Sequence, residues 1–200
     1  MRVALLTIRS HPGCTLKDVA GGYGTVFEVG RSLPARLLEL AKERVADLPS
    51  LTLAYLAAQL SEHEVEVRDL SPRDPVPRAE VAIVLSSITD ATAERELCAR
   101  LRESGARAVV VGAFASARPE HYADVADAVV VGEPEALGAA ILDARGIVRA
   151  GEVEDLDGLP LPAWDPFPVR ATATRSCGGR RCRSARRAAA PTAAATARGA

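Results

Sequence analysis

The chain has 200 residues, of which 48% are hydrophobic, so it is long enough for one domain with an ordinary core and too short for two of good size. Its formal net charge is −1, but eight of the 25 basic residues are arginines within residues 170–200, where no acid occurs, which leaves 17 basic and 26 acidic side chains before them. No window approaches the roughly 18 to 20 apolar residues of a membrane span, and the first residues lead into a strand pattern rather than a secretion signal. The four cysteines, at positions 14, 98, 177 and 182, are too scattered for the disulfide framework of a secreted domain. We therefore expect a cytoplasmic protein with no membrane partner.

Short apolar runs alternate with longer segments of helical period, which predicts an α/β fold. The strands are expected at residues 3–8, 65–70, 81–86, 108–112 and 128–132, and the helices at 34–48, 51–62, 91–103 and 134–144, with Gly105 ending the third. Because the strand runs are almost wholly apolar, they suit a buried parallel sheet covered by helices on both faces. The simplest arrangement is a Rossmann-like (flavodoxin-like) five-stranded sheet in the order 2-1-3-4-5, with its ligand crevice between strands one and three.

Small and hydroxylated residues follow the predicted strands, at the end of the sheet where such folds bind ligands. The loop after strand three reads SSITDAT, that after strand four GAFASARPE, and that after strand five GEPE. Each has a structural alternative: helix capping for the first, a tight strand-to-helix turn for the second, and favourable placement of Glu133 and Glu135 near a helix start for the third. The glycine cluster at residues 21–24 lacks the pattern of a phosphate loop, and we interpret it as a loop that could cover the crevice.

A proline-rich segment, DLDGLPLPAWDPFP, precedes an abrupt change of composition. Four prolines exclude a helix or a central strand there, so the segment is interpreted as an extended connector. We expect three parts: a domain over residues 1–150, a linker over 151–169, and a tail over 170–200. The tail has no apolar residue larger than alanine apart from two cysteines, which predicts disorder.

Five segments together resemble the N-terminal cobalamin-binding-like domain of cobalamin-binding-type radical S-adenosylmethionine proteins. They are LPSLTLAYLAAQLSEHEVEVRDL, VAIVLSSITDATAE, VVVGAFASARPE, DAVVVGEPEAL and DLDGLPLPAWD, in the order and approximate spacing of that family. Ser86-x-Ile88 and Gly112-Ala113 look like the family's Ser-x-Leu and Gly-Gly elements, which lie beside the corrin and its nucleotide tail. The resemblance implies cobalamin as cofactor, with a groove for that tail lined by Ser86, Ser87, Ile88, Thr89, Gly112, Ala113, Gly132 and Glu133.

The loop after the first strand departs from the family pattern. Members that bind cobalt through a histidine use Asp-x-His-x-x-Gly, with the aspartate orienting the histidine. Here the loop reads RSHPGCTLKD, so His11 has no aspartate two residues before it and Cys14 stands at the glycine position. His11 is retained as a candidate cobalt ligand, with a turn histidine before Pro12 as its alternative, and the domain could also hold cobalamin without a protein ligand or have kept only the fold.

The tail lacks the family's Cys-x-x-x-Cys-x-x-Cys triplet, since only Cys177 and Cys182 occur there. No iron–sulfur cluster is therefore expected, and the chain is predicted to be inactive alone, with a separate catalytic radical domain as a candidate partner. The arginines could bind nucleic acid, but an out-of-frame translation of a G+C-rich gene explains them better.

The leading hypothesis is a corrinoid-binding domain without its catalytic half; the alternatives are a Rossmann-like interaction or regulatory module and a nucleic-acid-binding protein.

Overall fold

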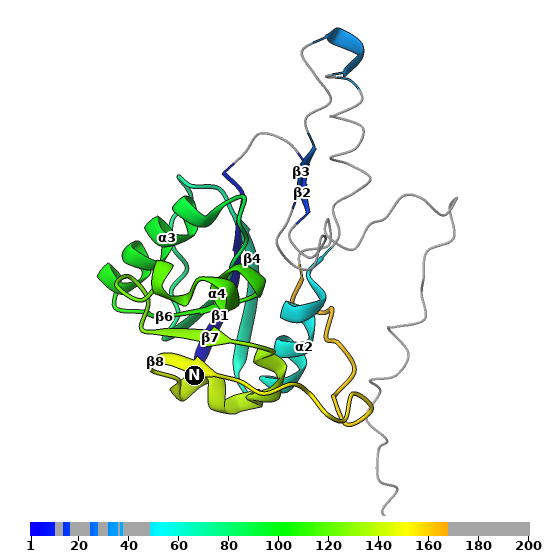
Figure 1. Cartoon of the computed structure of the whole chain (residues 1–200), viewed down its shortest axis with the longest axis vertical. Coiled ribbons are helices and arrows are strands. Elements are labelled where there is room, and N and C mark those ends of the chain that lie inside the picture. Colours follow the sequence, from blue (N-terminus) through cyan, green and yellow to red (C-terminus); the bar gives the residue numbers. More distant parts are fainter. Residues whose placement is uncertain (11–13, 17–24, 28–31, 36, 38–48, 168–200) are drawn as a thin grey trace, which may run out of the picture.

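Six parallel strands form the central sheet, in the order β4-β1-β5-β6-β7-β8 (Figure 1). The computed structural model describes residues 1–10, 14–16, 25–27, 32–35, 37 and 49–167. The strands of this sheet are β1 (Arg2–Ile8), β4 (Glu64–Leu70), β5 (Val81–Leu85), β6 (Arg107–Val111), β7 (Ala128–Val131) and β8 (Gly146–Arg149). In chain order this is 2-1-3-4-5-6, so the predicted α/β class and parallel order are confirmed.

The sixth strand, β8, was not predicted. It has only four residues, it pairs with β7 alone, and most of its side chains are exposed. An edge strand of this kind needs no continuous apolar run, so the sequence carries no strong signal for it. The expected sheet of five strands is corrected to six.

Helices cover both faces of the sheet, as expected (Figure 1). One face carries α2 (Leu51–Gln59) with the 3-10 helices η2 (Pro134–Ala136) and η3 (Gly138–Asp143), and the other carries α3 (Ala91–Glu103), α4 (Ala113–Ala117) and η1 (Pro119–His121). Val3 and Leu5 of β1 enter the first core, whereas Ala4 and Leu6 enter the second. The side chains of β5 alternate between the same two cores, so all five residues of this strand are buried and all five are apolar.

The helix ends follow from local sequence. Ser50 caps α2, its Oγ accepting a hydrogen bond from the Leu53 N–H at 3.2 Å. Helix α3 ends as predicted before Gly105, which has φ of +85°. The Gly105 N–H donates to the Arg102 carbonyl and the Ala106 N–H to the Leu101 carbonyl, which is the Schellman pattern.

Three other elements differ from the expectation. The helix predicted over residues 134–144 is two short 3-10 helices separated by Leu137, and α4 and η1 were not anticipated. A separate antiparallel pair, β2 (Cys14–Leu16) with β3 (Thr25–Phe27), was also missed. Of the helix predicted over 34–48, residues 34, 35 and 37 are helical and the rest lies outside the described residues, as do the glycine cluster at 21–24 and the tail at 170–200.

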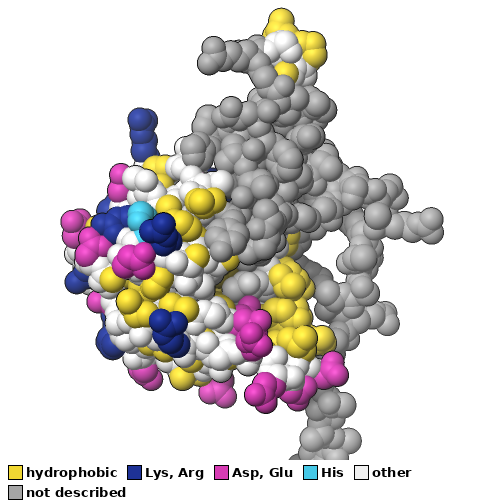
Figure 2. Space-filling view, in the orientation of Figure 1, with side chains coloured by type: hydrophobic (Ala, Val, Ile, Leu, Met, Phe, Trp, Pro, Cys, Tyr) yellow, Lys and Arg dark blue, Asp and Glu magenta, His cyan; other side chains and the backbone are white. Residues whose placement is uncertain are grey.

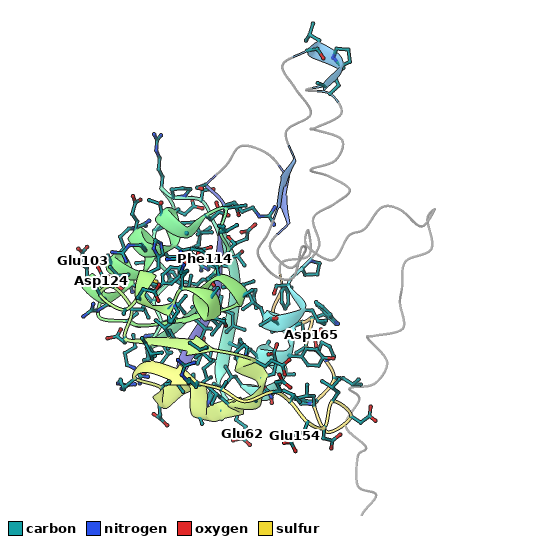
Figure 3. All side chains as sticks on the ribbon, in the orientation of Figure 1. Glu62, Glu103, Phe114, Asp124, Glu154 and Asp165 are labelled. Atoms are coloured by element: carbon teal, nitrogen blue, oxygen red, sulfur yellow. The ribbon has the colours of Figure 1, made fainter. Side chains whose placement is uncertain are left out.

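The segment after β8 returns across the α2 face of the sheet. Residues 151–167 form no helix or strand, and the Ala163 N–H donates to the Ala54 carbonyl of α2 at 3.0 Å. Phe167 is buried in the same core as Leu53, and Trp164 packs on its ring with centroids 5.5 Å apart. Asp165, labelled in Figure 3, lies beside α2. This part of the linker is therefore packed against the domain.

Candidate functional site

The loops that carry the predicted cofactor residues lie at one edge of the sheet. Because β1, β5, β6 and β7 are parallel, their carboxyl ends meet there, and the chain order reverses between β1 and β5. This is the switch point at which open α/β sheets bind ligands. The sequence-predicted residues from residue 86 to residue 133 are brought together along this edge.

Ser86 is fully buried and links two strand ends. Its N–H donates to the Val111 carbonyl at 2.8 Å, and its Oγ accepts from the Ala115 N–H at 2.9 Å. The second bond satisfies a free N–H in the first turn of α4, a helix with no cap from its own N-cap residue. Ser86 thus caps α4 from the neighbouring strand.

Gly112 is required by this close approach. Its φ is +112°, and a Cβ placed there would lie 3.1 Å from both the carbonyl oxygen and the Oγ of Ser86. The Gly112-Ala113 turn is therefore as tight as the structural alternative predicted. The space beside Gly112 is filled by Ser86 in this conformation.

Ser87 is fully buried below the rim. Its N–H and Oγ both donate to Oε1 of Glu94 at 2.9 Å, and its Oγ lies 3.2 Å from Oγ1 of Thr89. Tyr122 donates to Oε2 of Glu94 at 2.5 Å. Burial and the adjacent Glu94 raise the pKa of the Tyr122 phenol far above its ordinary range, and they raise the pKa of the Cys98 thiol to about 12.

Asp90 occupies the N-cap position of α3 but makes no side-chain cap bond to it. Its Oδ1 instead accepts from the N–H of Ser10 at 2.8 Å and from the Ser10 Oγ at 2.6 Å. The capping alternative is therefore wrong for this aspartate. Its carboxylate joins the loop after β5 to the chain leaving β1.

The rim itself is formed by side chains that reach solvent. Ile88 is 57% exposed, Thr89 and Ala113 are half-buried, and Gly132 and Glu133 are exposed. Among the predicted cofactor-binding residues, these five are accessible on the surface, together with the half-buried Gly112. Ser86 and Ser87 are not.

Glu133 holds the start of the linker, and Gly132 lies against the chain that leads into it. The Gly132 N–H donates to the Ser116 Oγ at 3.0 Å, and a Cβ at Gly132 would lie 2.5 Å from the Ala150 carbonyl oxygen. Oε2 of Glu133 accepts from the Val153 N–H at 2.7 Å rather than serving a helix start.

Glu94, Tyr122 and Ser116 are the residues at this edge that sequence reasoning missed. One signal existed for Glu94, since it lies three and seven positions before Leu97 and Leu101 on the apolar stripe of α3, and an acid on such a stripe indicates a buried, bonded carboxylate. Tyr122 and Ser116 lie in or beside short helices that the sequence did not predict.

His11 lies outside the described residues, as do Cys177 and Cys182. Within the described ranges, no cluster of three or more histidine, cysteine, aspartate or glutamate side chains is arranged to hold a metal ion.

A cavity of about 350 Å³ lies at the opposite end of the sheet, between β4 and residues 76–79. The charged residues that line this cavity are Arg2, Arg68, Arg78, Glu64 and Glu66. Because both charges are present, the lining favours neither an anionic nor a cationic ligand.

The sheet order and the loop-lined edge define a Rossmann-like parallel α/β domain. Comparisons with models of known protein families, with curated proteins and with solved structures find no match. None of the helices in the described part of the chain has the length and apolar content to cross a bilayer.

Proposed function

We propose that this chain is the corrinoid-binding domain of a protein of the cobalamin-binding radical S-adenosylmethionine type, without the iron–sulfur half. One observation carries the proposal. The parallel sheet brings the loops after β5, β6 and β7, which bear the family-like segments, to one edge beside the switch point.

The residues at this edge fit a corrinoid in part. Ile88, Ala113 and Gly132 present a low, partly apolar rim on which a large flat ligand could rest. A nucleotide tail between β5 and β6 does not fit this conformation, because Ser86 fills the space beside Gly112. The proposed contact is therefore with the rim, and a tail would have to displace Ser86.

The catalytic half would belong to a separate radical domain. Cys177 and Cys182 are two thiols where the family's cluster requires three, so the chain alone would hold the corrinoid and perform no radical chemistry. The proposed partners are thus a corrinoid and a catalytic domain.

Titration with hydroxocobalamin, followed by its visible absorption bands, tests the proposal. Binding should shift the bands, and Ile88→Asp should weaken binding roughly tenfold or more, because it replaces an apolar contact worth about 1.5 to 3 kcal/mol by a charge. Ile147→Asp is the matched control, because Ile147 is 49% exposed but lies on β8, at the far edge of the sheet. If the two variants bind equally, the rim is not the binding site. If the unaltered protein shows no band shift, corrinoid binding is refuted.

A Rossmann-like interaction or regulatory module is the second candidate. It is favoured by the internal roles of the small residues, since Ser86, Gly112 and Gly132 are each explained by contacts within the domain. The absence of any band shift would select it.

Nucleic-acid binding finds no support in the described domain. The linker is acidic, since Glu152, Glu154, Asp155 and Asp157 are all exposed, and Figure 2 shows several acidic side chains at the lower right of the domain. This surface would repel phosphates. Such binding would have to come from residues 170–200, and it should then disappear when they are deleted and weaken steeply with salt.

A further inference from the structure

We propose that Asp90 and Glu94 are positioning residues, which lock together three chain segments at the carboxyl edge of the sheet. The segments are the chain after β1 at Ser10, the loop after β5 at Ser87, and the chain after η1 at Tyr122. This inference rests on the proposed function in one respect, since the edge that they shape is the proposed corrinoid rim.

The side chain of Asp90 does not cap its own helix but binds a distant segment of the chain. An aspartate at an N-cap position ordinarily accepts from the N–H groups of its own helix. Asp90 is only 1% exposed and accepts instead from both donors of Ser10, which is 80 residues away in the sequence. The bond ties the point where the chain leaves β1 to the rim beside Ile88 and Thr89.

Glu94 is one helical turn further along α3 and is wholly buried. Its oxygens accept from the backbone and side chain of Ser87 and from the phenol of Tyr122. Tyr122 is itself buried and meets the ring of Phe114 edge-on, with centroids 6.2 Å apart; Phe114 is labelled on α4 in Figure 3. Glu94 therefore connects the loop after β5 to the layer formed by α4 and η1.

Stability alone is a poor reason for two buried carboxylates. Removing such groups from water is costly, and apolar residues of similar size often stabilise a core equally well or better. The carboxylates instead fix the orientation of the segments they bind, because each accepts hydrogen bonds from particular donors at defined angles. The chain at Ser10 and the loop at Ser87 border the switch point between β1 and β5, so Asp90 and Glu94 hold the geometry of this edge.

Amide hydrogen exchange on the full chain tests the positioning role without any ligand. In Asp90→Ala, the amide of Ser10 should exchange roughly tenfold faster or more, because it loses a charge-assisted bond. Amides in β6 should be unchanged, and Asp90→Asn, which keeps an acceptor at the same place, should restore most of the protection. Tyr122→Phe, which removes one bond to Glu94 and keeps the ring, should likewise accelerate exchange at Ser87. Unchanged exchange at Ser10 and Ser87 would overturn the proposal.

A hydroxocobalamin titration tests the link to the rim. Asp90→Ala should weaken binding roughly tenfold or more, while Asp90→Asn should bind nearly as the unaltered protein does. Leu101→Ala is the control, since Leu101 is buried on the same helix but away from the edge. Equal binding by Asp90→Ala and the unaltered protein would refute the role at the rim. Absence of binding by the unaltered protein would refute the proposed function alone, because the exchange experiment still decides the positioning role.

Discussion

At the residue scale, three glycines with positive φ differ in what surrounds them. A Cβ at Gly105 would meet nothing within 4 Å, one at Gly112 would lie 3.1 Å from Ser86, and one at Gly132 would lie 2.5 Å from the Ala150 carbonyl oxygen. All three alanine variants carry backbone strain, about 1 kcal/mol at Gly105 and more at Gly112, where φ of +112° with ψ of 177° is a conformation that essentially only glycine adopts. The two at the sheet edge add steric overlap.

We therefore expect the loss of unfolding free energy to rise in the order Gly105→Ala, Gly112→Ala, Gly132→Ala, from about 1 to about 3 kcal/mol. Urea unfolding followed by circular dichroism measures it. Gly105→Ala serves as the variant without steric overlap, and three equal losses would contradict the close contacts at the edge.

The buried thiol and phenol near Glu94 predict a loss of stability at alkaline pH. The pKa of Cys98 rises from its ordinary value of 9.0 to about 12, and the pKa of Tyr122 is raised further, chiefly because burial disfavours both charged forms. Above pH 9 the unfolded chain loses these protons first, so the free energy of unfolding falls as pH rises. Below pH 8 this effect should be absent.

Between pH 8 and 10, the protein should lose about 1 kcal/mol more stability than a Cys98→Ala variant, which lacks the thiol. Urea unfolding at the two pH values, under reducing conditions, gives the difference. Parallel pH dependences for the protein and the variant would show that Cys98 does not titrate as its burial predicts.

At the element scale, the linker behaves as part of the domain as far as Phe167. Phe167 is buried against Leu53, whereas Leu161 in the same linker is 90% exposed. Trp164 is the one tryptophan of the chain, so indole fluorescence reports on this part of the linker.

Phe167→Ala should lower the unfolding free energy by about 3 kcal/mol and shift the Trp164 emission to longer wavelength, because the indole loses its ring partner. Leu161→Ala should change neither. Fluorescence and urea unfolding together check this, and an unshifted spectrum with an unchanged midpoint would mean that the linker is not packed on α2.

At the scale of the whole molecule, residues 170–200 offer little apolar surface to bury, because they contain no apolar side chain larger than alanine apart from two cysteines. A chain that ends at Phe167 should therefore keep its unfolding free energy within about 0.5 kcal/mol, while its net charge changes from −1 to −9. A chain that ends at Ala150 should lose about 3 kcal/mol or more, since it lacks Phe167 and Ala163. A large loss in the longer truncation would show that residues 168–200 contribute to the fold.

The origin of the tail is tested in the gene. Translation of all three frames beyond the codon for Trp164 should yield the Cys-x-x-x-Cys-x-x-Cys triplet in another frame, followed by a long open stretch. If no frame yields it, the arginine-rich tail belongs to the protein and an independent binding role for residues 170–200 gains weight.

The sequence alone determined the α/β class, the parallel order and the end of α3, because these depend on local signals: apolar runs such as Val81–Leu85, helical spacing, and Gly105 after the last helical turn. It also placed the candidate loops correctly at one edge, since the carboxyl ends of parallel strands meet there.

Only the tertiary structure decided what the side chains at that edge do. Ser86 caps a helix that follows a different strand, Asp90 bonds Ser10 rather than its own helix, and Glu94 lies at the centre of a buried network. These contacts join residues between 7 and 80 positions apart. A hydrogen bond across such separations depends on how the layers pack, and no periodicity or motif within one segment encodes it.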